Sequence, residues 1–360
     1  MTTDELERKY SKRSSRWRLI LLLLIVALVI AVILCLNIGF APINFQDILA
    51  ILGKQIPFLN SSIDFSAISK TSETIIVQIR LPRVVAGALV GAGLAAAGVM
   101  YQGVFRNPMA DSYLLGASAG ASFGYTLAAI YASSLALSFF GLGLFQIVAF
   151  SGSVLTVFLV YYVSRVGNKV PITTLLLSGI VVNIFILALQ TVFELRSGNA
   201  LIGIVAWIAG GFTNITWNHI YVVFPFVLVG TLLAYFFTKD LNLLAMGDDT
   251  AQNLGVNTER VRQILLLTGS LITAAVVSIS GVIGFVGLII PHMTRLIIGP
   301  DHRFLLPTSA IVGAIFLILC DSLARIATGA SELPVGVITA LAGTPFFIYL
   351  LRSKKTSYAL

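Results

Sequence analysis

The sequence predicts an all-α polytopic membrane protein with about ten transmembrane helices, and three observations support this fold class. Of the 360 residues, 58% are hydrophobic and only 11% are charged. A soluble protein carries about 25% charged residues. The mean hydropathy is high, at +0.97. The third observation is the spacing of the apolar runs, because many reach the roughly 20 residues that a helix needs to cross a bilayer.

Two of the apolar runs need an interpretation of their own. The first run, Leu19 to Leu36, follows a basic cluster and exceeds the roughly 7–15 apolar residues of a signal peptide, so we expect an uncleaved span. The run from Arg262 to Ile298 would be about 55 Å long as one helix, so we expect a hairpin that turns at 278–281. The expected spans are 17–38, 84–103, 113–133, 139–164, 171–195, 219–238, 262–279, 282–298, 305–325 and 334–351.

The distribution of basic residues orients these spans. With the N-terminus in the cytoplasm, 17 of the 23 Lys and Arg residues fall on the inner side, where membrane proteins concentrate them. We therefore expect two cytoplasmic ends, with a basic tail at 1–16, a transmembrane domain at 17–351 and a tail at 352–360. Because short loops between spans account for the net charge of +8, we expect lipid and not nucleic acid around this chain.

Two loops are long enough to hold structure of their own. The outer loop 39–73 is expected to hold one short helix near 45–52. The inner loop 239–259 spaces Leu244, Gly247, Ala251 and Leu254 by three, four and three residues, and Gly255 is a good helix stop. We expect one amphipathic helix there, at about 243–256. Its polar face carries Asp, whereas helices that lie on lipid favour Lys and Arg, so a soluble partner is the better fit.

The stretch from Gly281 to Pro307 is apolar up to Pro291 and then becomes basic. Gly281, Gly284 and Gly287 are three apart, so we expect them to share a helix face that another backbone approaches closely. Pro291 has no N–H for the Gly287 carbonyl, so the helix should bend there. His292 lies at the end of the apolar run, where an ordinary membrane helix is the alternative interpretation.

Charged and turn-forming residues at the span ends are the candidates for function. Arg80 and Arg83 are outer arginines three apart, a residue type and spacing suited to carboxylates or to anchoring at the interface. Asp321 and Arg325 are four apart and are expected to pair. On the inner side, Asn107–Pro108 is a turn signal. The neighbouring Met109 could act as an apolar plug or simply lie in the loop.

Enzyme chemistry is not expected from this sequence. It lacks the Gly-x-x-x-x-Gly-Lys-[Ser/Thr] phosphate loop, and its three histidines form no pattern for a metal or other cofactor. Cys35 and Cys320 lie in apolar spans and are expected to be small core residues. A secondary transporter is one rival interpretation, but it would need coupling acids at mid-membrane. A membrane enzyme is the other, and it would need a reactive cluster.

Taken together, these stretches resemble the FecCD-type family of ABC importer permeases, from about Ile75 to Leu351. The resemblance rests on ordered motifs, which are Arg80-Leu-Pro-Arg83, Gln102 through Asn107-Pro108-Met109-Ala110 to Leu115-Gly116, Gly247 to Gly255, Gly281 to His292, Asp301-His-Arg303 with Pro307, Glu332 to Gly336 and Gly343-Thr-Pro345-Phe346. One departure is Ser112, where many members of the family have proline after the acidic residue.

The resemblance implies a type II ABC importer permease architecture, with ten helices per subunit and a homo- or heterodimer around a central pathway. It implies that a separate ATPase docks at about 243–256. A substrate-binding protein would present carboxylates to Arg80, Arg83 and Arg325. The inner gate would lie at Asn107, Pro108 and Met109, with Thr173 and Thr174. The expected cargo is an iron chelate (a siderophore complex or haem), with cobalamin as the alternative, crossing a bacterial cell membrane by alternating access.

Overall fold

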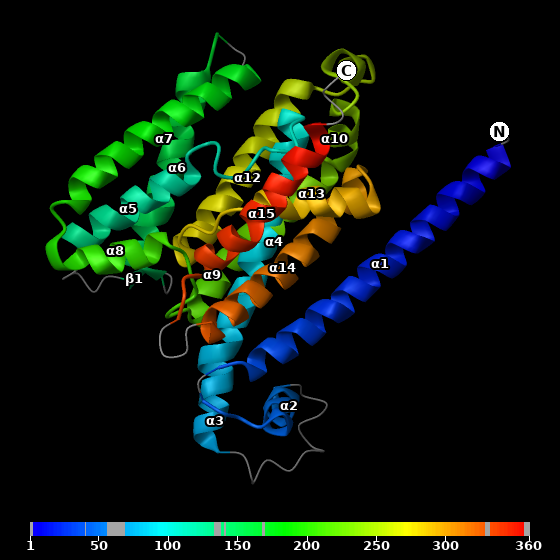
Figure 1. Cartoon of the computed structure of the whole chain (residues 1–360). Coiled ribbons are helices and arrows are strands. Elements are labelled where there is room, and N and C mark those ends of the chain that lie inside the picture. The colour runs from blue at the N-terminus through cyan, green and yellow to red at the C-terminus, as the bar shows by residue number, and fades with distance from the viewer. Residues whose placement is uncertain are drawn as a thin grey trace.

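The structure of the chain is a computed structural model that describes residues 3–39, 41–55, 69–132, 138–139, 142–167, 170–327 and 332–355. Within these ranges the secondary structure is almost entirely helical (Figure 1). The described strands are β1 (Ser138–Phe139) and β2 (Leu142–Gly143), which pair antiparallel. The predicted all-α class is therefore confirmed.

Ten helices of the described chain correspond to the ten expected spans. They are α1 (Thr3–Asn37), α4 (Leu81–Phe105), α5 (Ala117–Tyr131), α6 (Leu144–Ser164), α7 (Ile172–Glu194), α9 (Trp217–Phe236), α12 (Thr258–Ser280), α13 (Val286–Ile298), α14 (His302–Ile326) and α15 (Val335–Lys355). Seven helical stretches in this part of the chain are long and apolar enough to cross a membrane. The three shorter members are α5, α13 and the apolar part of α15.

Seven shorter helical segments of the described chain complete the fold. They are α2 (Phe45–Lys54), α3 (Lys70–Thr74), a π-helical turn (Ile75–Arg80), a 3-10 helix (Gly198–Ala200), α8 (Leu201–Ile208), α10 (Thr238–Leu244) and α11 (Asp248–Asn253). The position of α2 confirms the helix expected near 45–52. Helix α3, the π-helical turn and α4 form one continuous helix of 36 residues, about 54 Å long at 1.5 Å per residue. Its outer end therefore projects beyond the other helices (Figure 1).

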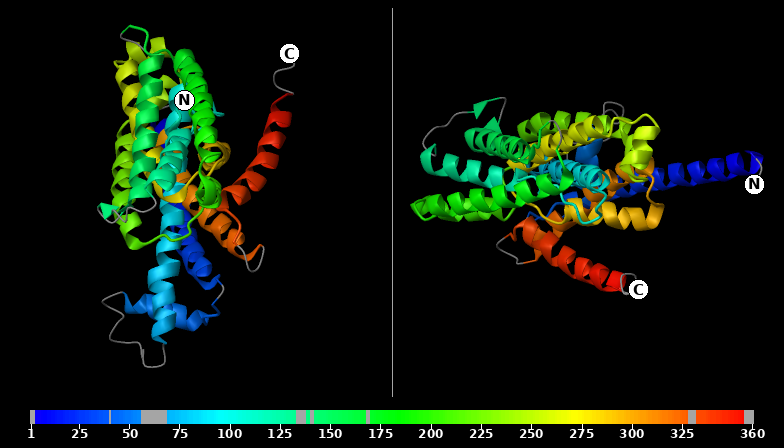
Figure 2. Two further views of the ribbon diagram at one scale, coloured as in Figure 1. Left: turned by 90° about the vertical axis from the view of Figure 1, so that its left-hand side faces the viewer. Right: turned by 90° about the horizontal axis from the view of Figure 1, so that it is seen from above.

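Helix α4 lies at the centre of the packing. It contacts α9, α12, α13 and α14, and most of its side chains are buried. Two of its glycines allow these close approaches: Gly91 lies against the Gly313 carbonyl of α14, and Gly98 against the Gly287 carbonyl of α13. Helices in membranes associate mainly through such close packing, because lipid tails are as apolar as the side chains. Figure 2 shows α4 surrounded by the other helices.

The two ends of the molecule carry different short elements. Helices α2 and α3 lie at one end, whereas α10, the first residues of α1 and the last residues of α15 lie toward the other (Figures 1 and 2). We refer to these as the outer and inner ends, following the orientation that the distribution of basic residues predicts.

Several expected boundaries differ from the structure. The 278–281 hairpin is confirmed, because α12 ends at Ser280 and Gly281 adopts φ 65°. However, α13 begins only at Val286, so Gly281 and Gly284 are not part of its face. The segment expected as a tail at 1–16 is helical from Thr3. The span expected at 113–133 begins at Ala117, and its residue 133 lies outside the described residues, as do 1–2 and 356–360.

Candidate functional site

At the outer end, two buried arginines hold the C-terminal end of α1. Arg80 donates to the carbonyl oxygens of Leu36 (2.8 Å) and Ala41 (2.5 Å). Arg325 donates to those of Ile38 (2.6 Å) and Cys35 (3.3 Å). The last carbonyls of a helix have no partner within it and form the negative end of its dipole, so cations are favourable there.

This arrangement changes the expectation for both residues. Arg80 and Arg325 are each only 5% exposed, and their guanidinium groups are already occupied. Direct contact with carboxylates of a binding protein would have to displace the end of α1. We therefore expect these two arginines to influence docking by fixing the outer ends of α1, α4 and α14.

The third predicted docking residue, Arg83, belongs to an outer ion cluster of Arg83, Asp321, Arg325 and Glu332. Its guanidinium donates to Asp321 from Nη2 (2.8 Å) and Nε (3.0 Å), and to Glu332 from Nη1 (2.8 Å). Asp321 also pairs with Arg325 (3.2 Å), as their spacing of four residues predicts. Asp321 is buried between two cations, whereas Glu332 lies at the surface. Arg83 is thus the member whose partner can exchange with a carboxylate from outside.

At the inner end, the loop expected to form one helix forms two. Helix α10 ends at Leu244 and α11 begins at Asp248, because Gly247 adopts φ 119°, a conformation that L-residues with side chains rarely adopt. Leu244 and Ala251 are buried, as the predicted stripe requires. Leu254 is 59% exposed, which corrects its place in that stripe. Gly255 follows α11 with φ 86° and ends it as predicted.

Helix α10 is fastened to the start of α14. Asn242 donates to Asp301 (2.8 Å) and accepts from the backbone N–H of His302 (2.9 Å). Burial opposes ionisation of Asp301, but hydrogen bonds from Arg303 and Asn242 outweigh it and lower the pKa of this carboxyl to about 2. The carboxylate therefore stays charged and caps α14 at any physiological pH.

The loop 106–116 joins α4 to α5 and holds the predicted gate residues. Asn107 accepts from the backbone N–H of Met109 (2.9 Å), which forms the turn that Asn-Pro predicts. Met109 is 44% exposed and free to contact a passing molecule or a partner chain. The rest of the loop turns back into the protein. Tyr113 donates from its hydroxyl to the Ile283 carbonyl (2.8 Å), and Gly179 of α7 lies against Leu114.

The other predicted gate residues are not part of this loop. Thr173 and Thr174 lie in the first turn of α7, where Thr173 is exposed and Thr174 half-buried. The same turn begins after Pro171, at the inner end of the helix. Both threonines therefore lie at the inner end of α7, and among the described residues the structure records no hydrogen bond between them and Asn107, Pro108 or Met109.

The glycines and the proline of the segment 281–292 have different surroundings in the structure. Gly287 packs closely against α4, as predicted, whereas Gly281 instead lies against the Trp207 carbonyl and Gly284 faces open space. His292 is buried in α13. Pro291 cannot donate to the Gly287 carbonyl. Gln102 of α4 supplies a substitute donor, with its Nε2 lying 3.0 Å from the Leu288 oxygen and 3.5 Å from the Gly287 oxygen.

Gln102→Leu should therefore destabilise the α4–α13 contact, because the substitution leaves a buried carbonyl group without its side-chain donor. We expect the free energy of unfolding to fall by about 1–3 kcal/mol. The measurement is reversible unfolding in mixed detergent micelles. Gln46→Leu is the matched control, since Gln46 is exposed on α2. Equal stability of Gln102→Leu and the control would contradict the role of Gln102.

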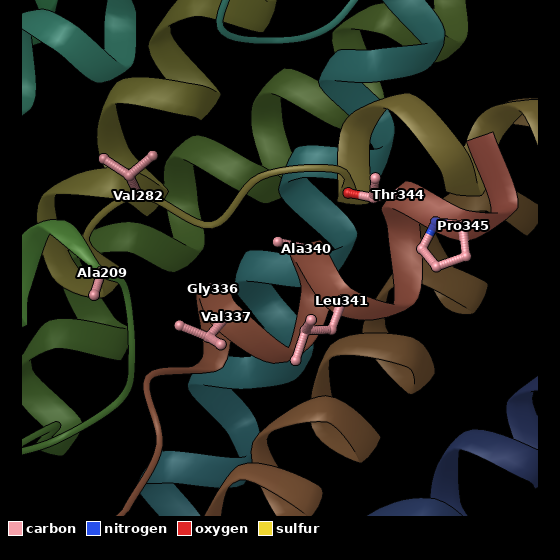
Figure 3. A pocket seen from close by; sticks show the side chains of 8 residues that line it. All are labelled: Ala209, Val282, Gly336, Val337, Ala340, Leu341, Thr344 and Pro345. Carbon is pink, nitrogen blue, oxygen red and sulfur yellow. The ribbon is translucent and has the colours of Figure 1, made fainter. Parts of the chain in front are cut away.

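An apolar hollow of about 580 Å³ opens between α15 and two neighbouring loops (Figure 3). Its lining comes from the residue after α8, from the break between α12 and α13, and from one face of α15. The lining residues are Ala209, Val282, Gly336, Val337, Ala340, Leu341, Thr344 and Pro345. The threonine hydroxyl is the polar side-chain group among them. The hollow therefore offers an uncharged surface with few directional contacts.

Sequence reasoning missed several of these features. Arg80 and Arg325 cap the end of α1 from positions about 40 and about 290 residues further along the chain. No local spacing in the sequence indicates this capping. Asp111 is a further acid that the loop folds into the protein against Gly287. Gly247 is the sequence signal for the break between α10 and α11, but a glycine also fits the predicted apolar stripe.

Sequence comparison with known proteins identifies the family of this chain. The model of the FecCD transport family matches residues 24–353. A cobalamin import system permease protein of Halobacterium salinarum is 42% identical over 288 residues, which cover 80% of this chain and 76% of that protein. An iron(3+)-hydroxamate import system permease protein of Bacillus subtilis is 38% identical, over 80% of this chain and 73% of that protein.

A solved structure shares the fold over almost the whole chain. It is described as a metal-chelate type ABC transporter in an inward-facing conformation. The TM-score is 0.76 at 31% sequence identity, and the match covers 93% of this chain and 99% of that one.

Proposed function

Because this chain belongs to the FecCD transport family and is a permease of an ABC importer, we propose that it translocates a metal chelate into the cell. An iron chelate, such as a siderophore complex or haem, is the proposed cargo. A cobalamin complex, in which the metal is cobalt, is the alternative, supported by the cobalamin permease at 42% identity. The iron(3+)-hydroxamate permease supports iron, and the metal-chelate type transporter supports a chelate as the cargo without specifying the metal.

The uncharged lining of the hollow beside α15 is the observation that carries this proposal. A bare metal ion that loses its water needs oxygen, nitrogen or sulfur ligands along its path. The hollow offers one threonine hydroxyl. A chelate brings its own ligands and presents a larger and less polar surface, so it can pass such a wall without being held tightly. Weak binding suits a conduit, because a tight site would retain the cargo.

The proposed complex has three further components. A second permease subunit, identical or related, would complete the pathway along α15. An ATPase subunit would dock on α10 and α11 at the inner end, which places both chain ends in the cytoplasm. A binding protein would dock at the outer end beside Arg83. ATP binding would then move α10 and α11, and the helices fastened to them would open the pathway by alternating access.

Uptake into proteoliposomes tests the proposal. The permease, its ATPase and its binding protein are reconstituted together, and iron-labelled ferric hydroxamate, haem and labelled cobalamin are supplied separately. We expect an iron chelate to accumulate only when ATP and the binding protein are both present. Accumulation of cobalamin alone would establish the alternative cargo. Uptake that follows a proton gradient without ATP would overturn the proposed function.

The affinity for the binding protein provides a further prediction, because Glu332 forms an ion pair with one nitrogen of the Arg83 guanidinium. Glu332→Gln should strengthen docking several-fold, since it frees Arg83 for a carboxylate of the partner. Arg83→Gln should weaken docking by about tenfold, or roughly 1.4 kcal/mol. Both effects should shrink as salt rises, because the Debye length falls to about 8 Å at 0.15 M.

Surface plasmon resonance on the complex in nanodiscs measures both affinities. Lys54→Gln is a suitable control, because Lys54 also forms an ion pair at the outer end, with Glu73 of α3, and lies outside the outer ion cluster. If Glu332→Gln and Arg83→Gln changed the affinity in the same direction, exchange of carboxylates at Arg83 would be excluded.

A further inference from the structure

Three helix ends meet at one carboxylate at the inner end of the molecule. Asp248 is the first residue of α11, Arg106 directly follows α4, and Arg262 lies in the second turn of α12. Asp248 Oδ1 accepts from Arg262 Nη2 at 2.5 Å and also pairs closely with Arg106 Nη2. The two arginines come from segments about 150 positions apart, so the tertiary structure alone brings them together.

The chain positions on either side of this cluster make it more than a surface ion pair. Arg106 has φ 49°, which ends α4, and the next three residues are Asn107, Pro108 and Met109. The carboxylate of α11 therefore holds the residue from which the loop 106–116 begins. On the other side, Arg262 joins the same carboxylate to α12, whose far end leads into the hollow.

Stability alone gives a weak reason for this arrangement. Asp248 and Arg106 are partly exposed, and exposed ion pairs contribute little to folding because water and salt screen them. Geometry gives a stronger reason. Two guanidinium groups repel each other, and one carboxylate between them keeps both helix ends at a fixed distance from α11. Without it, α11 would lose its ion pair with Arg106 at the end of α4, whereas the hydrogen bond from Gln252 to Thr258 (3.1 Å) would still join it to α12.

We propose that Asp248 is a positioning residue that transmits the movement of α10 and α11 to the loop 106–116. This inference rests on the proposed function, in which a separate ATPase moves these two short helices. Asn242 fastens α10 to the start of α14, and Asp248 fastens α11 to the ends of α4 and α12. A displacement of α10 and α11 is therefore transmitted to the start of the loop 106–116 through the Asp248 carboxylate.

The adjacent residue Asp249 provides the matched control. It has the same charge, lies on the same helix and is exposed. In the part of the chain that the structure describes, it has no ion pair. An effect of charge on the surface that meets the ATPase would be shared by both acids, whereas transmission to the loop 106–116 belongs to Asp248.

The first test measures cargo delivered per ATP hydrolysed in proteoliposomes that contain the whole complex. Asp248→Asn should lower this ratio about tenfold while ATP hydrolysis stays within twofold. Asp248→Glu should largely restore it, and Asp249→Asn, which removes a charge from the same proposed docking surface, should lower it much less than Asp248→Asn. Arg106→Gln should resemble Asp248→Asn, and the double variant should be no worse than either, because both remove one connection. A normal ratio in Asp248→Asn, or an equal loss in Asp249→Asn, would overturn the inference.

The second test needs neither cargo nor ATPase, so it separates this inference from the proposed function. Spin labels at cysteines replacing Met109 and Asn253 report the distance between the loop and α11 in the full chain. We expect a narrow distance distribution in the native background and a clearly broader one with Asp248→Asn. An unchanged distribution would refute the positioning role even if uptake behaved as proposed. No uptake by the native complex, with the broadening observed, would refute only the proposed function.

Discussion

Asp321→Asn should be among the most destabilising single substitutions in this chain. Asp321 is 1% exposed and lies between the guanidinium groups of Arg83 and Arg325. The amide keeps the size of the side chain but removes its charge, so two cations lose their shared counterion in a poorly hydrated place. Breaking a buried ion pair in this way costs about 3–5 kcal/mol.

The destabilisation caused by Asp321→Asn should also affect the attachment of α1. Arg325 holds the carbonyls of Ile38 and Cys35, and repulsion from Arg83 would move it. The measurement is reversible unfolding in mixed micelles, together with proteolysis after the end of α1. Asp249→Asn is the control, because its carboxylate is exposed. If Asp321→Asn unfolded at the same denaturant concentration as this control, the outer ion cluster would have no role in holding the helices together.

Gly98→Ala should be comparably severe for a different reason. A Cβ at position 98 would overlap with the carbonyl oxygen of Gly287 and crowd its Cα at 2.9 Å. Both partners are backbone atoms, so no rotation of a side chain can relieve the overlap. The two helices α4 and α13 must separate, and overpacking of this kind costs on the order of 3 kcal/mol.

Gly203→Ala is the matched control, since a Cβ there meets no atom within 4 Å. We expect that variant to be as stable as the native chain or slightly more so, because alanine favours helix over glycine. Thermal unfolding of the purified variants in detergent distinguishes the two glycines. A native-like Gly98→Ala would show that α4 and α13 do not pack as closely as the structure has them.

Much of the fold could be predicted because it depends on local sequence properties. Apolar runs of about 20 residues mark the spans, and the length of Arg262–Ile298 requires the turn that occurs after Ser280. Turn chemistry at Asn107–Pro108 and the helix stop at Gly255 follow from the backbone preferences of those residues. The pairing of Asp321 with Arg325 follows from helical spacing.

Other features could not be predicted, because they depend on which distant residues meet. Arg80 looks like a surface arginine in the sequence, and only the packing of α1 beside α4 buries it. Gly281 and Gly287 have helical spacing, but the helix begins between them, and each glycine accommodates a different backbone. Gly247 is compatible with both a helical stripe and a break, and its spacing from Leu244 and Ala251 predicts the stripe, which is wrong because Gly247 adopts φ 119° between α10 and α11.

Hydropathy and ordered motifs are properties of the chain read in order, so they suffice to identify a helical membrane protein of the FecCD family, and the charge bias predicts its orientation. Which charged side chains are already paired, and which remain accessible, follows only from the packing of the helices. Asp321 joins Arg325 of its own helix to Arg83 of α4, and Asp248 joins Arg106 to Arg262. The contacts between different helices arise from three-dimensional packing of segments whose separation in sequence carries no signal.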